Sequence, residues 1–241
     1  MNRVEIKIVT YIVTILTILN RAQFTFELDN GLARTPPMGW LSWARCTCQI
    51  DCDKYPSDCI NENLYLTMAT RMVNDGYLKA GYQYVNIDDC WSEKQRDSTS
   101  QHLIPDRIRF PNGIRSIADR LHGMKLKLGI YTDMGTATCA GYPALLIGGS
   151  SATNYMILDG STYLNWTVDS IKVDGCNADD DTFDTLYPRF GNVLNMTGKF
   201  YRHTRPLKKE KAHSEVHSNI ISMVVFLFGL SLFVHMRSQD L

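Results

Sequence analysis

The chain has 241 residues, of which 44% are hydrophobic and 21% are charged, and its formal net charge is zero. These proportions are ordinary for a folded globular domain. Without excess positive charge there is no reason to expect a nucleic-acid partner, and we predict none.

The N-terminus has the pattern of a secretory signal peptide. Arg3 and Lys7 precede an uncharged stretch at residues 8–20, which is too short to span a bilayer comfortably. We therefore assign residues 1–22 to a signal peptide. An uncleaved anchor is the alternative.

Four segments have the pattern of short buried strands that end in polar or aromatic residues. They are residues 37–43, 82–91, 128–133 and 170–176. In the last of them, Ile171 and Val173 alternate with Lys172 and Asp174, as a pleated strand requires. Lys172 and Asp174 therefore point to the same side. They are either catalytic groups at the mouth of an α/β barrel or a structural ion pair.

Segments with helical spacing lie between the strands. The apolar stripes are Leu64, Met68, Met72 and Val73 in the first, and Ile114, Ile117, Ala118 and Leu121 in the second. Strands that alternate with helices predict a βα repeat with one functional face.

The second strand ends in Asp88 and Asp89, followed closely by Trp91. Carboxylates accept hydrogen bonds from hydroxyl groups, and an indole ring packs on apolar C–H groups. This combination of side chains suits a sugar ligand.

Four motifs, at residues 28–40, 87–91, 127–131 and 172–176, occur together in one order and strand context. In these four motifs and in their order, the sequence resembles the α-galactosidase / α-N-acetylgalactosaminidase family of retaining glycoside hydrolases, over residues 28–199. The resemblance implies an α/β fold, the N-terminal half of a (β/α)8 TIM barrel with four strand–helix units. The family's later strands and its C-terminal β-sandwich domain have no counterpart in the sequence.

The resemblance also implies a site. Asp174 would be the nucleophile, and the substrate pocket would be lined by Trp43, Asp88, Asp89, Tyr131 and Lys172, with Cys139 and Cys176 beside it. Retaining glycosidases use two carboxyl groups about 5 Å apart, a nucleophile and an acid/base. Lys172 would favour the ionised form of Asp174. No cofactor and no metal are expected.

The acid/base group is not visible in the sequence, because in the family it lies on a later strand than the match includes. Asp179, Asp180 and Asp181 follow the fourth strand, but such a run more often opens a helix or lies in a solvated loop. An open half-barrel would also expose sheet edges and apolar surface, so we expect association with a partner or a homodimer.

Seven cysteines favour an oxidising compartment. The resemblance pairs Cys48 with Cys90, Cys52 with Cys59, and Cys139 with Cys176. Cys46 is left over, either to pair between chains or to remain free. A zinc site among residues 46–59 is the alternative, although no His ligand lies nearby.

Asn165 and Asn195 begin glycosylation sequons, which indicates the secretory pathway, with a lysosomal or extracellular destination. Residues 200–241 form a divergent basic and apolar tail, in which residues 219–236 have borderline length for a membrane segment. Lys208, Lys209 and Lys211 before it would favour the cytosolic side, which conflicts with a cleaved signal peptide. The tail is therefore either an anchor that associates with membranes or the product of an aberrant transcript.

Three functions remain open. The chain is a retaining hydrolase that removes terminal α-linked galactose or N-acetylgalactosamine from glycans and glycolipids, a non-catalytic relative that binds galactose, or a truncated product without independent function.

Overall fold

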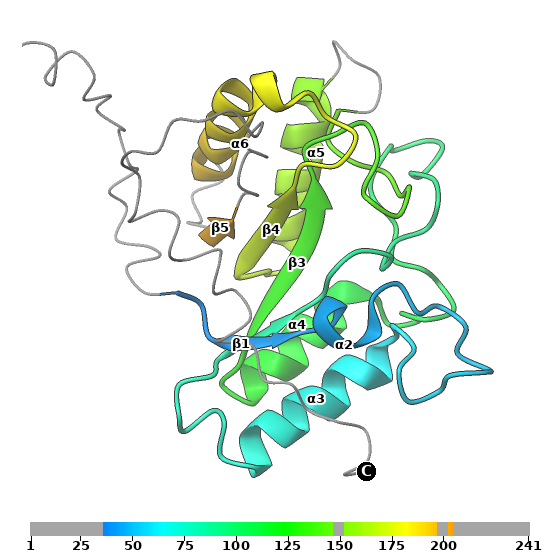
Figure 1. The fold of residues 1–241 in the computed structure, drawn as a ribbon, viewed down its shortest axis with the longest axis vertical. Helices are drawn as coiled ribbons and strands as arrows, with labels where there is room; N and C mark the ends of the chain where they lie inside the picture. The colour runs from blue at the N-terminus through cyan, green and yellow to red at the C-terminus, as the bar shows by residue number, and fades with distance from the viewer. Residues whose placement is uncertain (1–35, 147–151, 197–201, 205–241) are drawn as a thin grey trace, which may run out of the picture. The chain divides into compact units, whose positions relative to one another are not determined.

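The computed structural model describes residues 36–146, 152–196 and 202–204. In chain order the elements are β1 (Gly39–Leu41), α2 (Trp43–Cys46), α3 (Glu62–Asn74), β2 (Tyr84–Asn86), α4 (Gly113–Gly123), β3 (Lys127–Asp133), α5 (Ala152–Asn165), β4 (Ser170–Asp174), the 3-10 turn η2 (Asp180–Thr182), α6 (Phe183–Met196) and β5 (Arg202–Thr204) (Figure 1). The predicted signal peptide, residues 28–35 of the first motif and the predicted membrane segment lie outside the described residues.

All five strands form one parallel sheet, and their order in the sheet is their order in the chain. Helices lie between successive strands, which confirms the predicted α/β class. β3 is buried along nearly its whole length, from Leu128 to Asp133, as expected for a parallel strand covered on both faces.

A fifth strand was missed in the sequence. β5 pairs with β4 from Arg202 to Thr204 and extends the sheet beyond Lys199, where the sequence pattern placed the end of the barrel domain. The segment Arg-His-Thr contains no apolar residue, so hydrophobic alternation could not indicate it.

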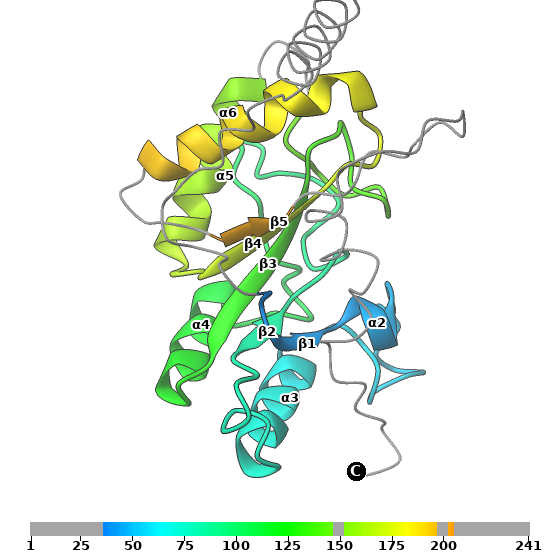
Figure 2. The same cartoon turned by 60° about the vertical axis from the view of Figure 1, so that its left-hand side comes forward.

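Helices α3 and α4 lie side by side, and so do α5 and α6 (Figures 1 and 2). Both predicted apolar stripes are buried, with one exception: Val73, in the last turn of α3, is 38% exposed. The prediction for Val73 was wrong: Met72 is fully buried at this end of the helix, whereas Val73, one position later and next to the last residue of α3, lies at the surface.

The starts of α3 and α4 are joined by polar side chains. Asn61 caps α3 by accepting a hydrogen bond from the backbone N–H of Leu64 at 2.9 Å. Asn112 precedes α4, but its side-chain amide donates to both carboxylate oxygens of Glu62, at 3.2 and 3.1 Å. The two helices therefore hold a fixed position at this end.

A buried ion pair fastens the long connection between β2 and α4 to helix α5. Two guanidinium nitrogens of Arg96 donate to the two carboxylate oxygens of Asp159, both at 2.7 Å, and the Asp159 side chain is fully buried. Arg96 also donates to the carbonyl of Ala144 at 3.1 Å, and His102 bonds to Thr162 on α5.

No helix among the described residues combines the length and apolar character that crossing a bilayer requires.

We expect Asp159→Asn to lower the free energy of unfolding by about 3–5 kcal/mol, because the amide leaves the buried Arg96 cation without its counter-charge. Urea denaturation of the full chain measures this change. As a matched control, Asp119→Asn removes the carboxylate from an exposed pair with Arg115, and the expected loss is below about 1 kcal/mol. Equal losses in both variants would contradict a structural role for the Arg96–Asp159 pair.

Candidate active site

The carboxyl ends of three neighbouring strands bring most of the predicted site residues together. Asp88 follows β2, Tyr131 and Asp133 lie at the end of β3, and Lys172 and Asp174 lie at the end of β4. Because these strands are parallel neighbours, the side chains meet at one edge of the sheet.

Lys172 links two of the carboxylates. Its Nζ lies 2.8 Å from Oδ2 of Asp88 and 3.8 Å from Oδ2 of Asp174, which confirms that Lys172 and Asp174 point to the same side of the strand. Its ammonium group also lies 4.9 Å from the centre of the Tyr131 ring. Burial raises the pKa of Asp88, and the neighbouring Lys172 ammonium opposes that rise.

Asp174 is the carboxylate of this group that solvent can reach, with a side chain 25% exposed. Its Oδ2 accepts a hydrogen bond from the Tyr131 hydroxyl at 3.2 Å, and its Oδ1 accepts one from the N–H of Gly175 at 3.0 Å. The Tyr187 hydroxyl donates to its backbone carbonyl at 2.8 Å. A carboxylate held in this way and open on one side can contact a ligand.

Asp89 has a different environment from Asp88. Its carboxylate accepts hydrogen bonds from the N–H of Cys90, the hydroxyl of Thr138 and the N–H of Ala140, at 2.7, 2.8 and 2.9 Å. It therefore anchors the loop that follows β3. Its predicted contact with a sugar stays a prediction beside this observed role.

Trp43 begins α2, directly after β1, and is 36% exposed. The preceding residue, Ser42, is buried, and its hydroxyl accepts the backbone N–H of Asp88 at 3.0 Å. This bond fixes the start of α2 against the end of β2. The contact of Trp43 with a sugar also stays a prediction.

Asp133 was not singled out in the sequence. Its carboxylate is fully buried and accepts the N–H of Gly135 and the N–H of Cys176, at 2.6 and 3.0 Å. Burial raises its pKa to about 7. The sequence contains a pattern that points to it: Asp133 lies two residues after Tyr131 on a predicted strand, so both side chains point to the same face.

The three disulfides of the structure join the same pairs that the resemblance implies. They are Cys48–Cys90, Cys52–Cys59 and Cys139–Cys176. The third lies at the site, because Sγ of Cys139 is 3.7 Å from Oδ2 of Asp174 and 3.4 Å from the Tyr131 hydroxyl. A side chain at Gly135 would collide with the carbonyl of Cys176, so only glycine fits between the two strand ends.

Cys46 is buried and has no disulfide partner among the described residues, and burial raises the pKa of its thiol to about 11. One potential ligand atom each from Asp133, Cys139, Asp174 and Cys176 lies within 4.8 Å of the others. The two sulfur atoms are bonded to each other, so the group offers a metal only two carboxylates.

The remaining predicted residues lie on other elements. Asn165 is exposed at the end of α5, and Asn195 is half-buried near the end of α6. Asp179 accepts the N–H of Asp181 at 3.1 Å, and Asp181 lies in the η2 turn ahead of α6. The aspartate run therefore opens a helix, as expected.

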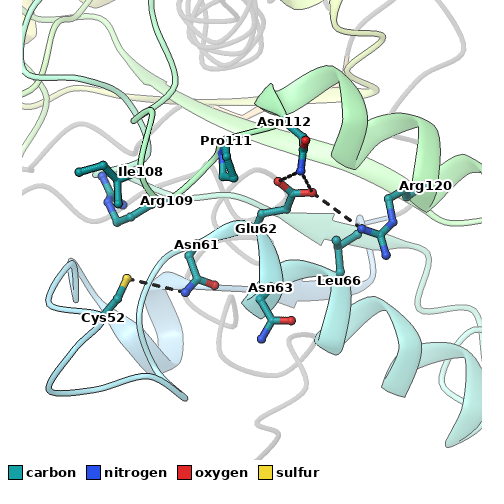
Figure 3. A pocket seen from close by; sticks show the side chains of 10 residues that line it. All are labelled: Cys52, Asn61, Glu62, Asn63, Leu66, Ile108, Arg109, Pro111, Asn112 and Arg120. Atoms are coloured by element: carbon teal, nitrogen blue, oxygen red, sulfur yellow. Dashed lines mark hydrogen bonds and ion pairs between the residues drawn. The ribbon is translucent and has the colours of Figure 1, made fainter.

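A pocket of about 400 Å³ lies elsewhere, between the starts of α3 and α4 (Figure 3). Its charged groups are paired: Glu62 with Asn112 and, at 3.8 Å, with Arg120, and Arg109 with Asp106 and the carbonyl of Ile60. It contains none of the residues around Asp174, and we assign it no role.

Comparisons with known proteins identify the family of the chain. The family model described as α-galactosidase A matches residues 35–224, which extends past Lys199. The α-N-acetylgalactosaminidase of Gallus gallus is 45% identical over 172 residues, which are 71% of this chain and 41% of that protein. The α-galactosidase A of Homo sapiens is 46% identical over 173 residues, which are 71% of this chain and 38% of that protein. The chain thus spans about two fifths of the length of the curated relatives it matches.

Solved structures show the same fold. An α-galactosidase from Saccharomyces cerevisiae superposes with a TM-score of 0.61 and 34% identity, covering 73% of this chain and 36% of that one. The α-galactosidase I of Mortierella vinacea gives a TM-score of 0.61 and 35% identity, covering 73% and 42%. The sheet corresponds to the N-terminal part of a TIM barrel, as predicted. On these grounds the chain belongs to the α-galactosidase A family of glycoside hydrolases.

Proposed function

We propose that this chain carries the sugar-binding side of a retaining glycosidase site, and that Asp174 attacks the anomeric carbon of a terminal α-linked galactose or N-acetylgalactosamine. The observation that carries the proposal is the setting of Asp174: a carboxylate 25% exposed to solvent, with an ammonium group at 3.8 Å and a phenol at 3.2 Å. Both neighbours stabilise a negative charge on Asp174, which is the form that attacks.

In the first step a carboxylate oxygen of Asp174 forms a bond to the anomeric carbon while the bond to the leaving oxygen breaks, and that oxygen takes a proton from a general acid. In the second step water hydrolyses the glycosyl ester. Lys172 and Tyr131 orient and stabilise Asp174, and the buried Asp88 carboxylate holds the Lys172 ammonium at 2.8 Å. The contact of Asp88 with sugar hydroxyls stays a prediction. Among the described residues we assign no general acid.

We further propose that the protein acts on glycans or glycolipids in the secretory pathway, in a lysosomal or extracellular compartment. Three disulfides support this location, because such bonds persist in oxidising compartments. An exposed Asn165, which begins a sequon, also supports it.

The proposal is tested by secreting the full chain from a eukaryotic host and following release of nitrophenol from α-galactoside and α-N-acetylgalactosaminide substrates. We expect Asp174→Asn to lower turnover on the order of 10⁴-fold or more, because an amide is a poor nucleophile. The exposed control Asp119→Asn should keep the wild-type rate. Turnover that survives in Asp174→Asn would rule out this nucleophile. Galactose binding by a wild-type chain without turnover would instead identify a non-catalytic relative.

The disulfide beside the nucleophile gives a second prediction. Replacing both Cys139 and Cys176 with Ser opens a link between positions 37 residues apart, and loss of such a constraint costs about 3–4 kcal/mol in the chain-entropy model. We expect a lower unfolding midpoint and faster proteolysis of the loop that follows β3. The double variant of Cys52 and Cys59, whose separation is 7 residues, is the matched control and should lose less stability. A protease map and unfolding midpoint equal to the wild type would contradict the prediction.

A further inference from the structure

A second carboxyl group lies beside the proposed nucleophile. Asp133 is the register partner of Asp174 across the β3–β4 pair, and one carboxylate oxygen of each lies within 4.8 Å of the other. Asp133 is 0% exposed, whereas Asp174 is open to solvent. Asp133 therefore does not contact a sugar, and any effect that it has on the reaction passes through its neighbours.

The bonds of Asp133 fix the backbone on both sides of the site. Its carboxylate accepts the N–H of Gly135 on its own chain segment and the N–H of Cys176, two residues beyond Asp174. The N–H of Met134 donates to the carbonyl of Asp174 at 2.8 Å in the same region. The Asp133 carboxyl group thus links the chain after β3 to the chain after β4 by hydrogen bonds.

Asp133 and Asp174 also share one hydroxyl group. The Tyr131 hydroxyl lies 3.2 Å from Oδ2 of Asp174 and 3.5 Å from Oδ2 of Asp133. A phenol has a single proton and donates it to one carboxylate at a time. When both carboxyl groups are ionised, they repel each other and compete for this proton.

The other ionisable groups around Asp133 are mostly acidic. Asp174 faces it from β4 and Asp89 from the end of β2, and both charges raise the pKa of Asp133 beyond the effect of burial, while the N–H groups of Gly135 and Cys176 lower it. The nearby cation, Lys172 on β4, is engaged with Asp88 and Asp174. This balance places the ionisation of Asp133 at about pH 7.

We propose that Asp133 is a positioning residue that also sets the charge of the site: it holds the strand end that carries Asp174, and in its neutral form it leaves Asp174 as the only anion that the Tyr131 hydroxyl contacts. This inference rests on the proposed role of Asp174 as nucleophile. It adds a buried carboxyl group, Asp133, whose ionisation changes the electrostatic surroundings of the nucleophile with pH.

The direct test is a carbon-13 NMR titration of the full chain with labelled aspartate carboxyl groups, between about pH 4 and 9. Asp133→Asn and Asp174→Asn assign the two resonances. We expect Asp133 to titrate near pH 7. The chemical shift of the Asp174 carboxyl carbon should show a step at the same pH, because a negative charge appears on Asp133, whose carboxylate oxygen lies within 4.8 Å of one on Asp174. That step should vanish in Asp133→Asn.

A matched control separates charge from structure. The Asp169 carboxylate joins the same two strands at their other end, where its Oδ2 accepts the N–H of Leu128 at 2.9 Å. Asp169→Asn should leave the step at Asp174 in place. A step that survives in Asp133→Asn, or that disappears equally in Asp169→Asn, would overturn the proposal.

The reciprocal variant keeps the test valid if Asp133→Asn does not fold. In Asp174→Asn a like charge is removed next to Asp133, so the pKa of Asp133 should fall below its wild-type value. An unchanged titration of Asp133 in that variant would show that the two groups are not coupled.

Covalent labelling distinguishes failure of this inference from failure of the proposed function. An α-galactosyl fluoride that carries a second fluorine on its ring needs little acid assistance and should label Asp174 in the wild type. Labelled Asp174 without the NMR step would overturn the inference alone. The NMR step without labelling would support the coupling of the two carboxyl groups and overturn the assignment of Asp174 as nucleophile.

Stability gives an independent measurement. Because the pKa of Asp133 is raised from 3.8 to about 7 in the folded chain, the folded state binds this proton more tightly than the unfolded state. The contribution to stability is therefore fully present below the unfolded value and is lost as pH rises to about 7. We expect the unfolding midpoint of the wild type to fall over this range relative to that of Asp133→Asn. Parallel midpoints in the two chains would contradict the raised pKa.

Discussion

The pairing of β3 with β4 is the constraint on which the rest of the site depends. Its register places Tyr131 opposite Lys172 and Asp133 opposite Asp174, so two pairs of side chains of the candidate site are aligned by backbone hydrogen bonds alone. A slip of one residue would turn each of them to the other face of the sheet. The Cys139–Cys176 disulfide and the Asp133 carboxylate then secure the chain just beyond this pair. The geometry around Asp174 is thus set first by the sheet and only afterwards by side chains.

Charge at this edge is unevenly balanced. Four carboxyl groups come together here, those of Asp88, Asp89, Asp133 and Asp174. Lys172 is a cation that forms ion pairs with two of them, Asp88 at 2.8 Å and Asp174 at 3.8 Å. Hydrogen bonds stabilise the rest: three reach the carboxylate of Asp89 and two backbone N–H groups reach Asp133. Asp174 remains the acidic group with exposed surface. The shortest neutralising contacts are made by the buried acids, and the exposed Asp174 has longer ones. This difference is consistent with the proposed role of Asp174 as the nucleophile.

Much of this fold could be predicted from the sequence, because its central strands follow simple hydrophobic patterns. The alternation of Ile171 and Val173 with Lys172 and Asp174 identified β4 and placed both polar side chains on one face. The strand β5 escaped because Arg202–Thr204 has no apolar residue, and its pairing with β4 is visible only in three dimensions. Asp133 was overlooked for a related reason. Its position on the same face as Tyr131 follows from the strand pattern, but its hydrogen bond from Cys176, 43 residues away, does not. In the same way, the anchoring role of Asp89 depends on Thr138 and Ala140, which lie in a different loop.

Each strand of the sheet pairs with the strand next to it in the sequence. One consequence concerns synthesis, during which the chain emerges from the ribosome N-terminal end first. The contacts of Asp174 with Tyr131, Cys139 and Met134 all reach back to residues that are made earlier. Asp88, the partner of Lys172, is made earlier still. Domains fold in this vectorial direction as they are made, and pairing between sequence neighbours keeps the loops to be closed short. These contacts of Asp174 can therefore form as soon as β4 and the turn after it are free, whereas the hydrogen bond from Tyr187 on α6 to the Asp174 carbonyl can form only after α6 has been made.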